Sequence, residues 1–398
     1  MTAPFSDVIR LKPKANARAI RHGAPWVYDN ELVLDRRTRK LEPGTIAVLE
    51  DAERTPLALV AVNPLSKITA RVLERDLTAQ IDQTWLAARI ARALEMRSRL
   101  YPDPFYRLIH AEADGLPGVV VDRFGDTLVL QPNAAWAEAM LEPLAAALAE
   151  VTGCTTILKN AGGRTRSLEG LDDANAVLLG QAPETAVMVP MNGAQYAADL
   201  TGGQKTGLFF DQRPNHAFAA SLSQGAEVLD VFSHVGGFAL AALAGGAVSA
   251  VAVDGSAPAL ALAEQGAQAS GFGAAFTTRQ GDAFAQLEAL AGEGAQFDVV
   301  ICDPPAFAPN KQALEAGLRA YGRIARLAAP LVRTGGYLVL CSCSHAADLA
   351  RFRGACNTGI GRAGRAGALI HTGFAGPDHP QLPQLAETGY LKALFYRL

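Results

Sequence analysis

The sequence predicts an α/β protein in which a doubly wound, Rossmann-like sheet follows a small β-barrel and an α+β middle domain. Three observations support this fold. Short apolar strands with turns fill the first 75 residues, helical spacing begins near residue 78, and from about residue 221 apolar strands alternate with Ala-rich helices. Such alternation is typical of parallel sheets covered on both faces. The predicted domains are therefore 1–75, 76–200 and 201–398.

The first predicted domain consists of short strands. Residues 8–11, 45–49 and 57–62 form apolar segments, and Pro43-Gly44 marks a turn before the second of them. Short strands at this spacing favour a small β-barrel.

The middle domain mixes helical and strand patterns. Residues 78–101 are rich in Ala, Leu and Arg at helical spacing, and Asp114-Gly115 marks a turn. Further along, apolar segments at 187–191 and 194–200 flank Asn192-Gly193, a strong signal for a two-residue β-hairpin. We therefore expect an α+β segment that ends in a hairpin.

The third domain is predicted from four apolar strands, residues 228–232, 248–253, 298–302 and 337–341. Ala-rich segments with helical spacing separate them, as a parallel sheet requires. In such sheets ligands bind beyond the carboxyl ends of the strands, so we expect the functional site there.

The composition indicates a folded protein in a reducing compartment. Of the 398 residues, 49% are apolar and 19% charged, which is ample for packed cores. No run approaches the ~18 uncharged apolar residues of a membrane helix, and the first residues lack a signal-peptide pattern, so we expect a cytoplasmic protein without membrane association. The cysteines are odd in number and scattered, which predicts neither disulfides nor a metal site: Cys154, Cys302, Cys341, Cys343 and Cys356.

Charge is distributed unevenly along the chain. Residues 1–100 hold 17 Lys and Arg against 12 Asp and Glu, a balance of +5, whereas the remainder has a balance of −8. This asymmetry suits a basic nucleic-acid-binding module joined to an enzymatic domain, and the alternative is a solvated basic face. The candidate RNA-binding residues are Lys12, Lys14, Arg18 and Arg21.

Acidic residues follow three successive strands of the third domain. Asp230 precedes a Gly236-Gly237 turn, Asp254 ends the next strand, and Asp282 lies in the segment that follows, before the strand at residues 298–302. Glycine lets a ligand approach the backbone, and a carboxylate can accept hydrogen bonds from both ribose hydroxyls of an adenosine. A dinucleotide enzyme would show G-x-G-x-x-G here. This looser turn instead resembles the first motif of class I methyltransferases.

A wider resemblance covers nearly the whole chain. Gly203–Arg213 resembles the G-x-K-T-G-F-F-x-D-Q-R signature of a group of bacterial 23S rRNA methyltransferases that act on cytosine C5. Lys12-Pro13 and Arg21–Tyr28 resemble the PUA RNA-binding domain that opens this group, and Gly389–Lys392 resembles its terminal edge strand. The resemblance implies S-adenosyl-L-methionine as cofactor and rRNA, of the 23S class, as partner.

Gly203–Arg213 is interpreted as a lid over the cofactor, and the alternative is a helix N-terminus capped by Asp211. The resemblance assigns these residues to the cofactor: Lys205, Phe210, Gln212, Arg213, Asp230, Phe232, Ser233, Gly236, Gly237, Phe238, Asp254, Ser256, Asp282, Ala283, Asp303 and Pro304.

Asp303-Pro304-Pro305 follows the predicted strand at residues 298–302 and resembles the catalytic D/N-P-P motif of base methyltransferases. The prolines stiffen the backbone, so that Asp303 projects from the strand end. Amine-methylating enzymes place an aromatic residue directly after the prolines. Here Ala306 occupies that position and Phe307 comes one residue later, which weakens an amine target.

Cys343 is the candidate nucleophile. It belongs to a Cys-Ser pair at the end of a strand, as in RNA methyltransferases that form 5-methylcytosine, where the thiolate adds to C6 and activates C5. Cys341 is expected to be buried. Enzymes of this class with two cysteines carry the second directly after the Asp-Pro pair, where Pro305 stands here, so Asp303 is the nearest candidate base.

Two rival functions remain open from the sequence. The first is methylation of an exocyclic amine, guanine N2 or adenine N6, through Asp303-Pro304-Pro305 with a structural Cys343. The second is a non-catalytic RNA-binding protein that retains the cofactor fold. A homodimer is compatible with the sequence, which does not specify an oligomeric state.

Overall fold

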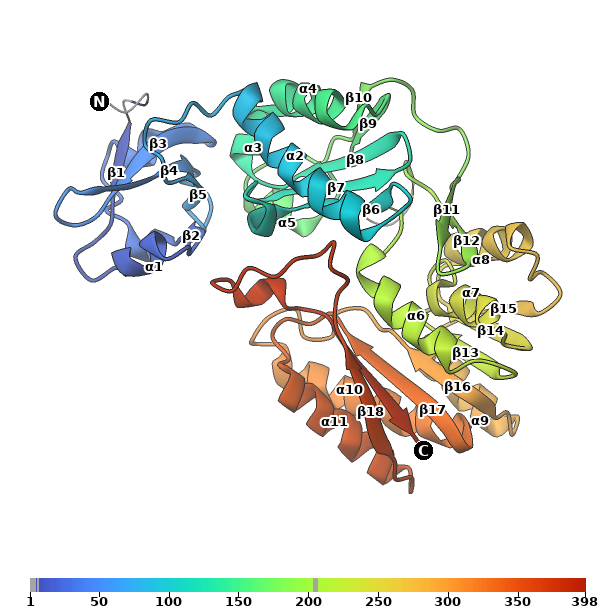
Figure 1. Ribbon diagram of the computed structural model, residues 1–398. Helices are drawn as coiled ribbons and strands as arrows, with labels where there is room; N and C mark the ends of the chain where they lie inside the picture. The colour runs from blue at the N-terminus through green and yellow to red at the C-terminus, as the bar shows by residue number, and fades with distance from the viewer. Residues whose placement is uncertain (1–4, 6, 203–206) are drawn as a thin grey trace. The chain divides into compact units, whose positions relative to one another are not determined.

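The computed structural model describes residue 5, residues 7–202 and residues 207–398. The chain forms two compact units (Figure 1). Unit 1 comprises residues 1–183 with 380–386, and unit 2 comprises residues 184–379 with 387–398. The three-domain division with boundaries at residues 75 and 200 stays a prediction. No helix in the described ranges is long and apolar enough to cross a membrane.

The first sheet of unit 1 has five short strands and one helix packed against it. These elements are β1 (Val8–Arg10), α1 (Ala17–Arg21), β2 (Trp26–Val27), β3 (Thr45–Glu50), β4 (Pro56–Val62) and β5 (Ala70–Glu74). The strand order is β1-β3-β4-β5-β2, with only the β1–β3 pair parallel. The strands predicted at 8–11, 45–49 and 57–62 are confirmed as β1, β3 and β4.

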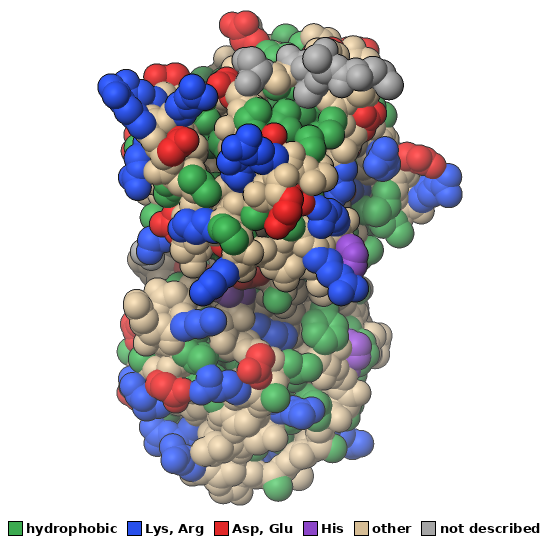
Figure 2. All heavy atoms as spheres, turned by 90° about the vertical axis from the view of Figure 1, so that its left-hand side faces the viewer, with side chains coloured by type: hydrophobic (Ala, Val, Ile, Leu, Met, Phe, Trp, Pro, Cys, Tyr) green, Lys and Arg blue, Asp and Glu red, His purple; other side chains and the backbone are tan. Residues whose placement is uncertain are grey.

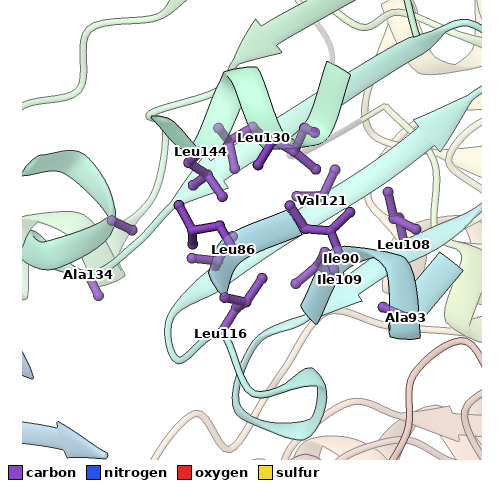
Figure 3. Close-up of a cluster of buried hydrophobic side chains, with 14 of the residues drawn as sticks. Leu86, Ile90, Ala93, Leu108, Ile109, Leu116, Val121, Leu130, Ala134 and Leu144 are labelled. Carbon is purple, nitrogen blue, oxygen red and sulfur yellow. The ribbon is translucent and has the colours of Figure 1, made fainter. Parts of the chain in front are cut away.

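The second sheet of unit 1 carries helices on one face. Its elements are α2 (Gln83–Leu100), β6 (Phe105–His110), β7 (Val119–Phe124), β8 (Thr127–Pro132), α3 (Ala135–Ala139), α4 (Leu141–Thr152), β9 (Thr156–Lys159), α5 (Arg164–Leu168) and β10 (Ala176–Leu179). The strand order is β10-β9-β8-β7-β6. Leu86 and Ile90 of α2 pack with Leu144 of α4 over Val121 and Leu130 of the sheet, as Figure 3 shows.

Buried charges join the two sheets of unit 1. Arg71 of β5 donates to Glu169 at 2.8 Å and to Glu112 at 3.3 Å, and all three side chains are less than 8% exposed. Asn63 and Ser66 donate further hydrogen bonds to Glu169. Removing one member of such a buried set is costly, because the opposite charge is left without a partner.

Unit 2 is built on the doubly wound sheet that the sequence predicts. Its strands are β13 (Glu227–Val231), β14 (Ser249–Asp254), β15 (Phe276–Gln280), β16 (Phe297–Cys302), β17 (Val332–Ser342), β18 (Ala368–Gly373) and β19 (Lys392–Arg397). The order is β15-β14-β13-β16-β17-β19-β18, and β19 alone of these described strands runs antiparallel to both neighbours. The four predicted strands correspond to β13, β14, β16 and β17.

Helices cover both faces of this sheet (Figure 1). They are α6 (Arg213–Ser221), α7 (Gly237–Ala244), α8 (Ala257–Ala269), α9 (Ala283–Gly292), α10 (Leu314–Ala328) and α11 (Leu349–Arg362). Buried residues of α9, α10 and α11 form one core with β13, β16 and β17. Helices α6 and α7 pack on each other, and so do α7 and α8.

Two expectations about smaller elements have different outcomes. The hairpin is confirmed as β11 (Val187–Met191) and β12 (Ala194–Ala198), with Asn192 and Gly193 at positive φ, and β12 packs against α8 within unit 2. The terminal edge strand expected around residues 389–392 is wrong. The final strand begins at Lys392 and lies between β17 and β18, because its apolar residues are buried on both faces, and β18 forms the edge.

Candidate active site

The turn after β13 lies where the strand order of the sheet reverses. β13 has β14 on one side and β16 on the other, so successive connections leave in opposite directions from this point. The backbone here is strained: φ is +63° at Phe232 and +51° at His234, a region that non-glycine residues rarely adopt. Such residues cost about 1–3 kcal/mol each and cluster at functional sites.

Asp230 lies near the end of β13 and is fully buried. Its Oδ2 accepts a hydrogen bond from the N–H of Ala239 in α7 at 2.9 Å. Burial, reinforced by the charge of Asp254, raises the pKa of Asp230 to about 7. Within the described residues, its Oδ1 and the buried Ser233 hydroxyl have no hydrogen-bond partner. Such atoms are suited to bind the polar groups of a ligand.

Local structure explains why glycine occupies both positions 236 and 237. Gly236 adopts φ of +80° at the start of α7, where any side chain would be strained. A Cβ at Gly237 would lie 2.8 Å from Cε1 of His216 on α6, so this glycine lets α6 and α7 approach. Phe238 packs against the same imidazole with a centroid separation of 4.4 Å. Burial lowers the pKa of His216 to about 3, so the ring is neutral.

The next two strand ends present further carboxylates. Asp254 is half-buried and accepts backbone hydrogen bonds from His234 at 2.9 Å and Ser256 at 2.8 Å, one on each oxygen. Each oxygen keeps a second lone pair and can still accept from a diol. Asp282 is exposed and caps α9, while Ala283 beside it is buried.

The arrangement fits the expected cofactor. The unpartnered oxygens of Asp230 and Ser233 suit an ammonium group, and the free lone pairs of Asp254 suit two ribose hydroxyls. All three residues belong to unit 2 and lie at the ends of the neighbouring strands β13 and β14. The assignment of individual residues to the cofactor stays a prediction.

The described part of the predicted lid, residues 207–213, is packed into unit 2. Phe210–Gln212 form a buried 3-10 helix before α6. Asp211 accepts a hydrogen bond from the Tyr390 hydroxyl at 2.6 Å and makes no cap on α6, so the alternative that Asp211 caps this helix is wrong. Lys205 lies outside the described residues.

Gln212 connects this segment to Asp303. Its Nε2 donates to Oδ2 of Asp303 at 2.9 Å, and its Oε1 accepts from Asn215 at 2.6 Å. The N–H of Asp303 donates to the carbonyl of Val231 at 3.1 Å, which holds the D-P-P segment against the end of β13. The Arg213 guanidinium lies 5.3 Å from the centre of the Phe210 ring.

The residues after Asp303 differ in exposure and packing. Pro304 is buried, and Ala306 is exposed. Phe307 belongs to an aromatic cluster, with ring centres 5.0 Å from Tyr321 and 6.3 Å from Phe284. Its ring is therefore occupied by packing contacts within the protein.

Cys343 directly follows β17 and, of the five cysteines, all of which are described, is the one that is not buried. Cys341 is 1% exposed, as the sequence predicts. Burial raises the pKa of Cys302, Cys341 and Cys356, which keeps these thiols protonated and unreactive. Because Cys302 pairs with Leu340 in adjacent parallel strands, Asp303 and Cys343 emerge at the same edge of the sheet.

Residues that sequence reasoning missed hold the segment around Cys343. The Tyr321 hydroxyl of α10 lies 2.9 Å from Oγ of Ser342 and 2.8 Å from Oγ of Ser344, the two neighbours of Cys343. Oγ of Ser344 also accepts from the N–H of Ala308 at 3.0 Å. The two serines around the thiol could have been noticed, whereas nothing local indicates Tyr321.

Lys392 is the second missed residue. It begins β19, pairs with Ser342 of β17, and is only 4% exposed. Its Nζ donates to the carbonyl oxygens of Ser344 and Ala347, both at 2.8 Å. Burial lowers the pKa of Lys392 to about 8, against the opposing influence of negative charge on Cys343 and Asp348. A buried cation therefore holds the segment that follows the candidate nucleophile.

The four predicted RNA-binding residues gather around α1 of unit 1. Lys12, Lys14, Arg18 and Arg21 are all exposed. Arg21 forms an ion pair with Asp51 at 2.6 Å. Lys12 donates to a backbone carbonyl. Their role in binding RNA stays a prediction.

Comparison with known protein families covers most of the chain. Residues 91–397 match the S-adenosylmethionine-dependent methyltransferase family, and residues 9–75 match the PUA-like domain. The solved structure of a putative methyltransferase in complex with SAH is similar over 99% of this chain and 100% of its own, with a TM-score of 0.84 at 19% identity. A putative SAM-dependent methyltransferase from Streptococcus mutans has a TM-score of 0.83 at 18% identity and the same coverage.

Curated relatives match over nearly their whole length. A protein of Deinococcus radiodurans named ribosomal RNA large subunit methyltransferase is 36% identical, with all of both chains covered. A protein of Vibrio cholerae named ribosomal RNA large subunit methyltransferase I is 34% identical over 95% of this chain and 96% of its own. With the strand-end carboxylates at the reversal point of its sheet, the chain belongs to the S-adenosylmethionine-dependent methyltransferase family, with a PUA-like domain at residues 9–75.

Proposed function

We propose that this enzyme methylates carbon 5 of a cytosine in the RNA of the large ribosomal subunit, 23S rRNA, with Cys343 as the covalent nucleophile. The observation that carries the proposal is the placement of Cys343. It is the partly exposed cysteine among five, at the same edge of the sheet as Asp303, on a segment held by Tyr321 and Lys392. A rigidly held, accessible thiol is what nucleophilic catalysis requires.

Two further observations support the substrate class. The relatives from Deinococcus radiodurans and Vibrio cholerae are named for the RNA of the large ribosomal subunit. The PUA-like domain carries four exposed cations around α1, and phosphate groups are bound by such side chains.

The residues that would hold the cofactor are Asp230, Ser233 and Asp254. The predicted set also includes Asp282 and Phe210. S-adenosylmethionine, when bound, supplies an electrophilic methyl group on a sulfonium. The protein's part is to orient it and to make cytosine C5 nucleophilic enough to accept that methyl group.

Cytosine C5 is activated by covalent addition. The Cys343 thiolate forms a bond to C6, the C5–C6 double bond opens, and its electron pair makes C5 a nucleophile that takes the methyl group. Removal of the proton from C5 then restores the double bond and expels the thiolate. Each bond made to the enzyme is broken again, so Cys343 is regenerated.

Asp303 is placed to hold the base or to accept the C5 proton. Its Oδ2 accepts a hydrogen bond from Gln212, which fixes the direction of the carboxylate, while its half-buried position leaves it accessible. A general base works through such a positioned group. In the amine-methylating alternative an aromatic ring would stack on the base, and Phe307 is engaged with Phe284 and Tyr321 instead.

The test is a covalent trap with rRNA that carries 5-fluorocytosine. Fluorine at C5 cannot leave as a proton does, so the wild-type enzyme should remain attached to the RNA in the presence of cofactor. Cys343→Ala should form no adduct and should lose methyl transfer by roughly 10³-fold or more, with cofactor binding near wild type. Cys154→Ala, which changes a buried thiol in unit 1, is the matched control and should be trapped normally.

Near-normal turnover of Cys343→Ala without an adduct would make the thiol structural. The amine-methylating reaction at Asp303 would then become the leading function. A wild-type protein that binds rRNA and cofactor without any methyl transfer would instead favour a non-catalytic RNA-binding role.

A further inference from the structure

An arginine-lined groove runs between α10 and α11 on one face of unit 2. Its volume is about 800 Å³, and it is lined from the N-terminal to the C-terminal parts of both helices. The arginines along it are Arg319, Arg323, Arg326, Arg351 and Arg362, and all five are exposed. The one acidic residue of its lining is Glu315. Figure 2 views the molecule from the side on which α11 lies in Figure 1 and shows Lys and Arg side chains across its lower part.

The groove begins next to the candidate active site. α10 follows β16 and the Asp303 segment, and α11 follows β17 and the Cys343 segment, so both helices start at the edge of the sheet that carries these residues. Arg351 lies in the first turn of α11, and Arg362 ends this helix, about 16 Å further along its axis. The basic lining therefore leads away from the site, within the same unit.

The charges of the groove are only partly compensated. Arg351 pairs with Glu315, and Arg323 pairs with Glu288 at 3.1 Å. For Arg319, Arg326 and Arg362 the described residues contain no ion-pair partner. These three cations belong to residues 101–398, whose net balance is −8, so their concentration on one face does not follow from composition.

Glycines make the groove narrow, and its lining also includes Leu318, Ala355 and Thr358. A Cβ at Gly359 would lie 2.3 Å from the carbonyl oxygen of Gly322, so these residues let the two helices approach. Gly354 is also part of the lining. Long, exposed arginine side chains along such a groove can follow a phosphate chain, and arginine forks match phosphate geometry.

We propose that the groove between α10 and α11 binds the phosphate backbone of the substrate RNA beside the target nucleotide. The inference deepens the proposed function, on which it rests for the class of substrate. The groove would be a second RNA-contacting surface, within the methyltransferase fold, in addition to the surface expected on the PUA-like domain. Charge complementarity selects RNA, because a groove that begins near the active site and carries three uncompensated cations further along is matched by a polyanion that must reach the site.

The test changes the three uncompensated residues together, Arg319→Gln, Arg326→Gln and Arg362→Gln. The probe is a full-length unmodified 23S rRNA transcript, and its Kd is measured over a series of salt concentrations. Loss of three phosphate contacts should reduce the slope of log affinity against log salt by about 2–3 and raise Kd roughly tenfold or more near 0.15 M salt. KM should rise, and kcat at saturating RNA should be unchanged.

A matched control removes three positive charges of unit 2 outside the groove, Arg279→Gln, Arg353→Gln and Arg397→Gln. Arg353 lies on α11 itself, so the control separates one face of that helix from another. Affinity and salt slope of the control should stay close to wild type. The thermal midpoints of both variants are compared, because Arg279 is half-buried and pairs with Glu293, whereas the other substituted residues are exposed and should change stability little.

Three results would overturn the inference. They are an unchanged Kd and salt slope in the groove variant, an equal loss in the control, or a loss of self-association in place of RNA affinity, which would make the face an interface between copies. Absence of wild-type binding to the transcript would do so too. None of these measurements uses Cys343, so the covalent trap can fail or succeed separately from this test.

Discussion

The ammonium of Lys392 is the group that connects the last strand to the segment of the candidate nucleophile. It donates to the carbonyls of Ser344 and Ala347, while Tyr321 holds the hydroxyls of Ser342 and Ser344. A nearby cation favours a thiolate over a thiol. Lys392 therefore acts as a positioning residue that also supplies charge to the surroundings of Cys343.

Replacement of Lys392 should change how Cys343 responds to pH. In Lys392→Met the rate of alkylation of Cys343 by iodoacetamide should fall, and its rise with pH should move upward, because the attraction between the Lys392 ammonium and a thiolate at Cys343 is lost. Lys392→Arg keeps the charge and should restore much of the rate. The measurement is the alkylation rate at Cys343, followed by mass spectrometry without RNA.

The pH range of this effect follows from the lysine. Its pKa is lowered to about 8 in the folded protein from 10.5, so it is charged below about pH 8 and loses its effect above that value. The charge of Lys392 has the opposite effect on the stability of the fold, because it is unfavourable to bury. Burial of the ammonium destabilises the fold below pH 8, and this cost disappears as pH rises from about 8 to 10.5. Identical alkylation profiles in wild type and Lys392→Met would limit Lys392 to holding the backbone.

Whether a site residue could be predicted from the sequence depends on how far away its partners lie in the chain. Asp230, Asp254 and Asp303 could be predicted, because the carboxyl ends of parallel strands converge on one edge of a sheet. Lys392 could not be, since its place beside Ser342 depends on the register of β19 against β17, between residues far apart in the chain. Asp211 was assigned as a possible cap from local sequence, and a distant residue, Tyr390, takes its oxygen instead.

At the scale of elements, the helices α10 and α11 are fixed by close contact. Gly359 faces α10, where a Cβ would lie 2.3 Å from the carbonyl oxygen of Gly322 and 2.7 Å from Cβ of Ala325. Gly354, on the same helix, is exposed and has nothing within 4 Å of its would-be Cβ. One helix therefore carries a glycine packed closely against its neighbour, Gly359, and a glycine that faces open space, Gly354.

Two alanine substitutions test this packing. Gly359→Ala should lower the free energy of unfolding by roughly 1–3 kcal/mol, because the obstructing atoms include backbone that cannot rotate away. Gly354→Ala should be neutral or stabilising by about 0.5–1 kcal/mol, as alanine favours an exposed helix over glycine. Denaturant unfolding measures both. Equal effects of the two substitutions would contradict the close approach of the helices.

Elements were easiest to predict where a pattern is local. The hairpin at Asn192-Gly193 was found from two residues, because both must adopt positive φ. The helix predicted over residues 78–101 begins at Gln83, since Asp82 caps it. The last strand was misplaced at the sheet edge, because its position between β17 and β18 depends on strand pairing that no local pattern identifies.

Across the whole molecule, the contributions of the basic residues of unit 1 and of unit 2 to RNA binding can be tested separately. In unit 1 the variant Lys12→Gln, Lys14→Gln, Arg18→Gln and Arg21→Gln should weaken rRNA binding and flatten its dependence on salt by about 3–4 in slope. Arg21 should contribute least, since Asp51 already pairs with it. Binding to a 23S rRNA transcript over a salt series measures the effect.

Point variants are preferable here to removal of the domain. Deleting residues 1–75 would take away Arg71, and Glu169 would stay buried without its cation, so folding and binding would be lost together. If the fourfold variant keeps both the affinity and the salt slope of wild type, the basic face of this domain is only solvated.

The position of β19 has a consequence for synthesis on the ribosome. β17 and β18 have no ladder with each other, and each pairs with β19, which follows all the other strands along the chain. Until residues 392–397 leave the exit tunnel, β17 and β18 each have an unpaired edge, and β18 cannot join the sheet. Lys392 arrives in the same interval. The other strands can therefore pair while the segment of Cys343 still lacks its cation, and the thiol gains its final surroundings only once β19 has joined the sheet.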